Sequence, residues 1–214
     1  MTEQTDAPMA DPDFDRALVT AALAEAAEHG WDRVTPFTAA RRADLPLDRA
    51  RARFPRRGSI LMALGRMADQ AALSGVTEEG SARDRLFDVL MRRIDALQAY
   101  RAGVLAVLKS LPTDPGTALL LACASERSMG WMLEAAGLSS AGLRGMLRTK
   151  GLVAVWLWTI RAWERDESED LSATMAALDT ALGRAEQFAH YLNTPPRPAE
   201  PPAPEADAAA DTPD

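Results

Sequence analysis

The spacing of apolar residues predicts a chain built from helices. Apolar side chains recur three or four residues apart through most of the sequence, and alanine and leucine, which favour helix, outnumber valine and isoleucine. The first predicted helix runs from Phe14 to His29, with Asp13 as its cap and Gly30 at its end. Its buried stripe should hold Phe14, Leu18, Ala21, Ala22 and Leu23.

Residues 34–61 predict two short helices joined by a tight turn. Thr35 can cap the first helix, Pro36 suits its first position, and residues 44–46 form the turn. The inward-facing residues should be Ala39, Ala40 and Ala43 in the first helix and Leu47, Ala50 and Phe54 in the second. Small residues where two helices cross, with long polar side chains outside, are typical of a helix-turn-helix.

This segment is strongly basic. Counting Arg33, the residue just before it, the segment has eight arginines: Arg33, Arg41, Arg42, Arg49, Arg51, Arg53, Arg56 and Arg57. Only Asp44 and Asp48 oppose them, so eight minus two gives a local charge of +6 in a chain of net charge −7. The arginines of the second helix cannot all share its inward stripe, so most should point outward. The simplest explanation is a solvated charged face, but the helix-turn-helix context favours a polyanion, most commonly DNA.

The rest of the chain continues the helical pattern. The predicted helices are Ser59–Leu73, Ala82–Tyr100, Ala102–Leu111, one capped by Asp114 that ends before Gly137, Leu143–Trp163, and one from the acidic run 166–170 to about Leu192. Residues 75–81 form a linker and the best domain boundary. No apolar run is long enough to span a membrane and no secretory signal is visible, so we expect a cytoplasmic protein.

Several apolar residues of the second half are expected in the core. In Leu143–Trp163, the most apolar helix, one stripe consists of Leu152, Trp156, Ile160 and Trp163. Val155 and Trp158 lie on another side, so this helix should be central or at an interface. The other residues expected inside are Met175, Leu178, Leu182, Phe188 and Cys123.

Residues that would support catalysis or metal binding are sparse. The histidines, His29 and His190, are far apart, and together with one cysteine they make no credible zinc site. No Ser-His-Asp order, phosphate-binding loop or dinucleotide glycine motif occurs. The acidic run 166–170 is most simply a helix start. We therefore predict a protein that is not an enzyme and has no cofactor or metal.

The N-terminal part resembles the DNA-binding domain of TetR-type regulators. The matching features, between about Phe14 and Leu64, are a helix followed by E-H-G-W (28–31), V-T (34–35), A-A-x-x-A (39–43), Leu45, Phe54, Arg57 and Ile60-Leu61. The resemblance implies DNA contacts by Thr35, Thr38, Arg42, Leu47, Asp48, Arg49, Arg51, Arg53 and Arg57. The sequence departs from the family pattern at Asp44, usually glycine, at Pro46, usually Ser or Thr, and at Ala50-Arg51, usually Leu-Tyr.

Residues 131–185 also resemble the C-terminal region of a TetR-fold, lipid-binding family that assists ubiquinone biosynthesis. The matching segments are W-M-L-E-A-A-G (131–137), R-T-K-G-L-V-A-V (148–155), D-E-S-E-D-L-S-A-T (166–174) and A-L-D (177–179). That family has an aromatic run where this chain has L-R-G-M (143–146). The resemblance implies an alternative function, lipid or isoprenoid binding without DNA binding.

A set of tryptophans and methionines is the second candidate site. An aromatic stripe at helical spacing is usually core, but it can also form a dimer face or an apolar pocket between helices. The residues proposed to bind an apolar small molecule or lipid are Met129, Trp131, Met132, Met146 and Trp156.

Together these features predict an all-α, TetR-like chain in which a three-helix helix-turn-helix domain precedes an antiparallel helical bundle. The expected divisions are a disordered segment 1–12, a DNA-binding domain 13–60, a connecting helix and linker 61–80, a ligand-binding and dimerisation domain 81–193 and a disordered tail 194–214. The predicted partners are double-stranded DNA, a second copy bound through the last two helices, and an apolar small-molecule or lipid ligand that would release the DNA. An arginine-bearing helix folded against acidic residues of its own chain would favour the lipid-binding alternative.

Overall fold

The computed structural model describes residues 10–193, without the side chains of the last four, and all regular structure in that range is helical. The α-helices are α1 (Asp11–His29), α2 (Pro36–Arg42), α3 (Leu47–Arg53), α4 (Arg57–Leu73), α5 (Ala82–Gln98), α6 (Arg101–Ser110), α7 (Pro115–Ala135), α8 (Gly142–Arg165) and α9 (Ser172–Asn193). A 3-10 turn, η1 (Trp31–Arg33), follows α1. The all-α prediction is confirmed. The predicted tail 194–214 lies outside the described residues.

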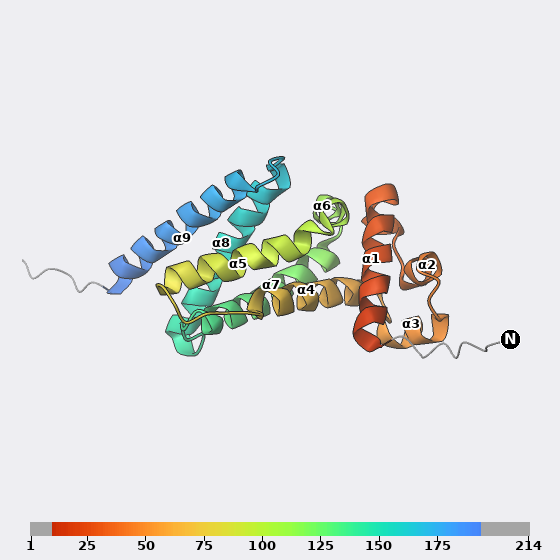
Figure 1. The fold of residues 1–214 in the computed structure, drawn as a ribbon, viewed down its shortest axis with the longest axis horizontal. Helices are drawn as coiled ribbons and strands as arrows, with labels where there is room; N and C mark the ends of the chain where they lie inside the picture. The colour runs from red at the N-terminus through yellow and green to blue at the C-terminus, as the bar shows by residue number, and fades with distance from the viewer. Residues whose placement is uncertain (1–9, 194–214) are drawn as a thin grey trace, which may run out of the picture.

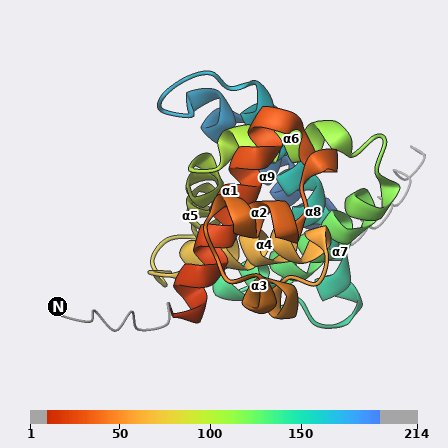
Figure 2. The same cartoon turned by 90° about the vertical axis from the view of Figure 1, so that its right-hand side faces the viewer.

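The helices form an elongated molecule with α1, α2 and α3 gathered at one end (Figure 1). We call α1–α3 the head and α5–α9 the body. Helix α4 runs from the head alongside α5 and α7, and α9 lies on the side of the body far from the head (Figure 1). Seen from the head end, α1, α2 and α3 stand in front of the body helices (Figure 2). Within residues 10–193, no helix has the length and apolar character needed to cross a membrane.

Helix α1 begins earlier than the sequence pattern suggests. It starts at Asp11, within the segment predicted to be disordered, and the cap position is Ala10 rather than Asp13. Pro12 lies in the first turn, where its missing N–H is not needed, and Asp11 and Asp13 lie where the helix dipole favours negative charge. Because α1 starts early, the Asp11 carboxylate lies at the N-terminal end of the helix.

The head packs around large aromatic residues and is joined to the body through α6. Phe14, Trp31 and Phe54 are almost fully buried. Gly103 of α6 lies directly against α1, because a Cβ atom built there would be 2.3 Å from the backbone oxygen of Leu23. The absence of a side chain at this position allows the two backbones to approach closely.

A buried polar cluster connects α4 to the body. The Arg93 guanidinium of α5 donates from Nε to Asp69 Oδ1 of α4 at 2.8 Å, and the Ser128 hydroxyl of α7 donates to Asp69 Oδ2 at 2.6 Å. The same guanidinium lies 4.3 Å from the centre of a Trp156 ring. Because Arg93 is buried, its charge depends on this single carboxylate and on the aromatic face.

The expected stripe of α8 is largely buried, but two of the predicted core residues are exposed. Phe188 is 64% exposed, because it follows Leu178 by ten residues and so lies about 80° around α9 from that buried residue. Cys123 is also exposed, on the outer face of α7. Both helices are rich in apolar residues on more than one side, so composition alone did not identify the inward face.

Candidate nucleic-acid interface

Two of the predicted site residues, Thr35 and Thr38, form the cap of α2. The Thr38 backbone N–H donates to Thr35 Oγ1 at 3.0 Å, and the Thr35 N–H donates to Thr38 Oγ1 at 3.1 Å. Pro36 occupies the first turn, as predicted. This reciprocal capping box fixes where α2 begins, so both hydroxyls have a structural role in addition to any contact with DNA.

The turn between α2 and α3 explains one departure from the TetR pattern. Asp44 has a φ of +52°, a left-handed conformation that glycine adopts without strain and aspartate tolerates better than most residues. A residue with positive φ therefore occupies the position at which the family usually has glycine. Leu45 next to it is buried and anchors the turn.

One side of α3 faces solvent. Leu47 was predicted to face inward but is 40% exposed, and Asp48 and Arg51 are exposed too. Ala50 and Phe54 pack into the head, as predicted. The Arg51 side chain donates only to the Pro55 carbonyl, at 3.5 Å, which is a weak interaction. Arg51 is therefore the arginine of α3 whose guanidinium is available to a partner.

The other two arginines of α3 lie against α1 rather than outward. Arg49 Nη2 is 2.6 Å from Asp11 Oδ1, and its guanidinium lies 4.3 Å from the centre of the Phe14 ring. Arg53 donates from Nε and Nη2 to the two oxygens of Asp15 at 2.6 and 2.7 Å, and its Nη1 is 2.8 Å from Asp11 Oδ2. The Arg49 hydrogen bond lowers the pKa of Asp11, and the Asp15 hydrogen bond raises the pKa of Arg53. Arg51 and Arg53 are exposed and Arg49 is half-buried, so most α3 arginines do avoid the inward stripe, but the ion pairs of Arg49 and Arg53 with α1 were not predicted.

Two further predicted DNA-facing arginines also have acidic partners. Arg42 of α2 donates to Glu28 at 2.7 Å and to Glu25 at 3.2 Å, and the first of these bonds lowers the pKa of Glu28. Arg57, at the start of α4, donates to Asp114 of the body at 2.6 Å. The eight arginines of the basic segment therefore fall into two groups, those with acidic partners and those without.

The unpaired basic side chains of the head include three that the predicted site omitted. Arg33, Arg41 and Arg56 are exposed and, among residues 10–193, form no ion pair. Phe37 of α2 is also highly exposed. The exposed surface of the head thus combines cations with apolar side chains, which suits the groove and backbone of a nucleic acid.

One group of side chains has metal-ligand geometry. Glu25, Glu28 and His29 place one ligand atom each within 4.8 Å of one another. The Arg42 guanidinium already bonds both carboxylates, so half of their negative charge is compensated without a metal ion. This group is best explained as part of the contact between α1 and α2.

The five predicted ligand-binding residues differ widely in exposure. Met129, Met132 and Trp156 belong to the packed core, whereas Trp131 is 63% exposed and Met146 is also exposed. Two surface hollows lie elsewhere. One, of about 380 Å³, is between α5 and α9, and the other, of about 550 Å³, is between α1 and α2. Neither hollow is lined by any of the five residues.

Solved structures share this arrangement of helices. A TetR transcriptional regulator from Nitrosomonas europaea ATCC 19718 has a TM-score of 0.65 and 24% sequence identity, over 82% of this chain and 99% of that chain. A TetR transcriptional regulator from Rhodococcus sp. RHA1 has a TM-score of 0.55 and 19% identity, over 82% of this chain and 97% of that chain. The chain has the TetR regulator fold. Comparisons of the sequence with protein-family models and with curated proteins gave no match.

In this chain, the two short helices α2 and α3 are joined by the tight turn that the sequence predicts for a helix-turn-helix, and α8 and α9 are the last two helices of the body. The fold predicted from the sequence resemblance is thereby confirmed. At this level of sequence identity the likeness concerns the fold, and the activity has to be argued from the residues of the head.

Proposed function

We propose that this chain is a DNA-binding transcriptional regulator of the TetR type. The observation that carries the proposal is the solvent-facing side of α3, where Leu47, Asp48 and Arg51 are exposed on the second helix of a helix-turn-helix. In such motifs this helix enters the major groove. A guanidinium there can bond a phosphate or guanine O6 and N7, and an apolar side chain can contact a thymine methyl group.

We infer further that two copies associate through α8 and α9. Leu157 and Trp158 of α8 and Phe188 of α9 are large apolar side chains that are more than half exposed. Exposed apolar groups of this size on neighbouring helices are typical of a protein interface. A dimer would hold two heads about one helical turn of DNA apart, the spacing that paired major-groove contacts require. Neither surface hollow is lined by the predicted ligand-binding residues, so we propose no ligand site.

The test is DNA binding by Arg51→Ala across a series of salt concentrations. If Arg51 contacts a phosphate, the slope of log affinity against log salt should become shallower by about 0.9. If Arg51 contacts a base, one position of the selected sequence should lose about 1–3 kcal/mol of discrimination. The control is Arg127→Ala, because Arg127 is exposed on α7 and forms no ion pair among residues 10–193. Equal binding by both variants would contradict the proposal.

One observation is compatible with the lipid-binding alternative, although the structural neighbours do not favour it. Arg42, Arg49 and Arg53 are folded against acidic residues of α1, which is the arrangement that a head without DNA contacts would tolerate. If the purified protein carries a stoichiometric isoprenoid or phospholipid and shows no salt-sensitive DNA binding, this alternative replaces the regulator proposal. Arg51 and the other unpaired arginines have no evident purpose in that case.

A further inference from the structure

The first two turns of α1 provide two carboxylates that face α3. Asp11 and Asp15 are four residues apart and therefore lie on the same side of α1, and Arg49 and Arg53 are likewise four apart on α3. The two pairs meet where the start of α1 lies beside α3 (Figure 1). The structure thus joins two arginines to two aspartates, with Asp11 contacting both guanidinium groups.

The Asp11 and Asp15 carboxylates bind the two guanidinium groups in the way that DNA phosphates would. Arg53 presents two N–H groups to the two oxygens of Asp15 at 2.6 and 2.7 Å, the bidentate arrangement by which a guanidinium also binds phosphate. Arg49 is held between Asp11 and the Phe14 ring. Neither arginine can offer the same donors to DNA while these bonds last, and the nearby carboxylates repel the DNA backbone.

We propose that Asp11 and Asp15 are specificity-determining residues that suppress binding to DNA of arbitrary sequence. The inference rests on the proposed DNA-binding function and extends it to residues outside the helix-turn-helix. Phosphate contacts supply sequence-independent affinity, whereas contacts with base edges discriminate between sequences. Holding Arg49 and Arg53 on α1 removes two phosphate-binding side chains and leaves discrimination to Leu47, Asp48 and Arg51.

The chain offers a matched control for the charge change. Asp13 lies in the same turn of α1 and Asp32 lies in η1, and both are exposed head carboxylates with no ion pair among residues 10–193. The double variant Asp13→Asn, Asp32→Asn removes two negative charges from the head, as many as Asp11→Asn, Asp15→Asn removes. Only the second double variant frees Arg49 and Arg53.

The experiment measures binding of the full chain to a random-sequence duplex and to a duplex that the wild-type protein selects from a random library. In Asp11→Asn, Asp15→Asn, affinity for the random duplex should rise about tenfold near 0.1 M salt, and the salt slope should steepen by up to about 1.8 for two added phosphate contacts. Affinity for the selected duplex should rise less, so the specificity ratio should fall. In the control double variant Asp13→Asn, Asp32→Asn, the slope of log affinity against log salt should be no steeper than in the wild-type protein.

A third variant separates freed arginines from a general change in charge. Adding Arg49→Gln and Arg53→Gln to Asp11→Asn, Asp15→Asn should return the slope to its wild-type value. Because Asp11 is largely exposed, Asp11→Asn alone provides the same test in the least perturbed protein, with about half the change in slope.

Two outcomes would overturn the inference. If wild-type protein selects and binds a duplex but Asp11→Asn, Asp15→Asn leaves both the random-duplex affinity and the slope unchanged, this inference fails while the proposed function stands. If no variant binds DNA at low salt although each is folded by circular dichroism, the proposed function and this inference fail together.

Discussion

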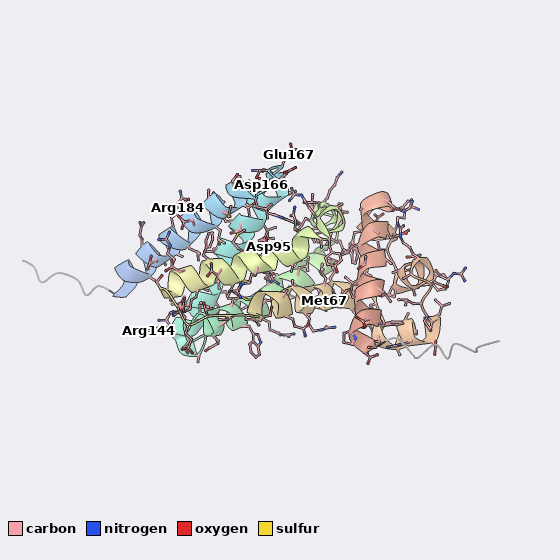
Figure 3. All side chains as sticks on the ribbon, viewed as in Figure 1. Met67, Asp95, Arg144, Asp166, Glu167 and Arg184 are labelled. Atoms are coloured by element: carbon pink, nitrogen blue, oxygen red, sulfur yellow. The ribbon has the colours of Figure 1, made fainter. Side chains whose placement is uncertain are left out.

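The Asp166 carboxylate should be one of the most important polar groups for the stability of the body. It lies between α8 and α9, next to the exposed Glu167 (Figure 3). One oxygen accepts hydrogen bonds from the backbone N–H and the hydroxyl of Thr174, both at 2.7 Å. The other accepts from the backbone N–H and hydroxyl of Ser168. These bonds, chiefly those of the two hydroxyls, hold the pKa of Asp166 well below its usual range.

Replacing Asp166 with Asn removes the charge and turns one acceptor into a donor that faces the N–H and hydroxyl of Ser168. Hydrogen bonds to a charged group contribute about 1.5–3 kcal/mol each, and they are not additive within one cluster. Thr174 is fully buried, so weakening its bonds cannot be offset by water. We expect Asp166→Asn to lower the free energy of unfolding by about 3 kcal/mol, a large part of the 5–15 kcal/mol typical of a domain.

The pH dependence follows from the direction of the pKa shift. Because the folded-state pKa of Asp166 lies below the unfolded value near 3.8, its stabilising contribution is present above pH 3.8 and declines as the pH falls through the folded-state pKa. Urea denaturation at fixed protein concentration, followed by circular dichroism, should therefore give the wild-type protein a higher free energy of unfolding than Asp166→Asn at pH 7. The difference between the two proteins should decrease at acidic pH. Glu167→Gln is the matched control. This account of Asp166 would be refuted if Asp166→Asn lowered the free energy of unfolding no more than Glu167→Gln does. It would also be refuted if the difference between wild type and Asp166→Asn did not change with pH.

Three further sets of substitutions test other parts of the structure. Arg93→Met should lower stability by about 3–5 kcal/mol in urea denaturation, because it leaves the Asp69 carboxylate without its ion-pair partner, and adding Asp69→Leu should recover part of the loss. Asp44→Gly should raise stability by about 0.5–1 kcal/mol and Asp44→Ala should lower it, because the backbone there has positive φ. Trp158→Asp should shift sedimentation toward a monomer while Trp131→Asp does not; a monomeric wild-type protein would contradict the proposed α8–α9 interface.

The sequence predicted the elements of this fold well because their signals are local. Apolar spacing located every described α-helix, and Thr35 and Asp114 were recognised as caps that the structure confirms. The start of α1 was missed by a few residues because Pro12 and two nearby aspartates, which resemble a linker, also suit the first turn of a helix.

The orientation of side chains around each helix was harder to predict than the helices themselves. Trp131 and Phe188 lie on helices with apolar residues on several sides, and periodicity gave no reason to prefer one face over another. The partners of the arginines were missed for a different reason. Arg49 and Asp11 are 38 residues apart in sequence, so a local window that counts charges contains one of them without the other.

The ion pairs change the electrostatic argument for DNA binding. The local window gave eight arginines against two aspartates, a charge of +6. Five more carboxylates, those of Asp11, Asp15, Glu25, Glu28 and Asp114, pair with those arginines in the folded chain, so eight arginines against seven carboxylates leave +1. A head of this charge should bind DNA with fewer phosphate contacts than the sequence suggests. Its affinity should therefore depend less steeply on salt, and a larger share of it should come from base contacts made by the exposed side of α3.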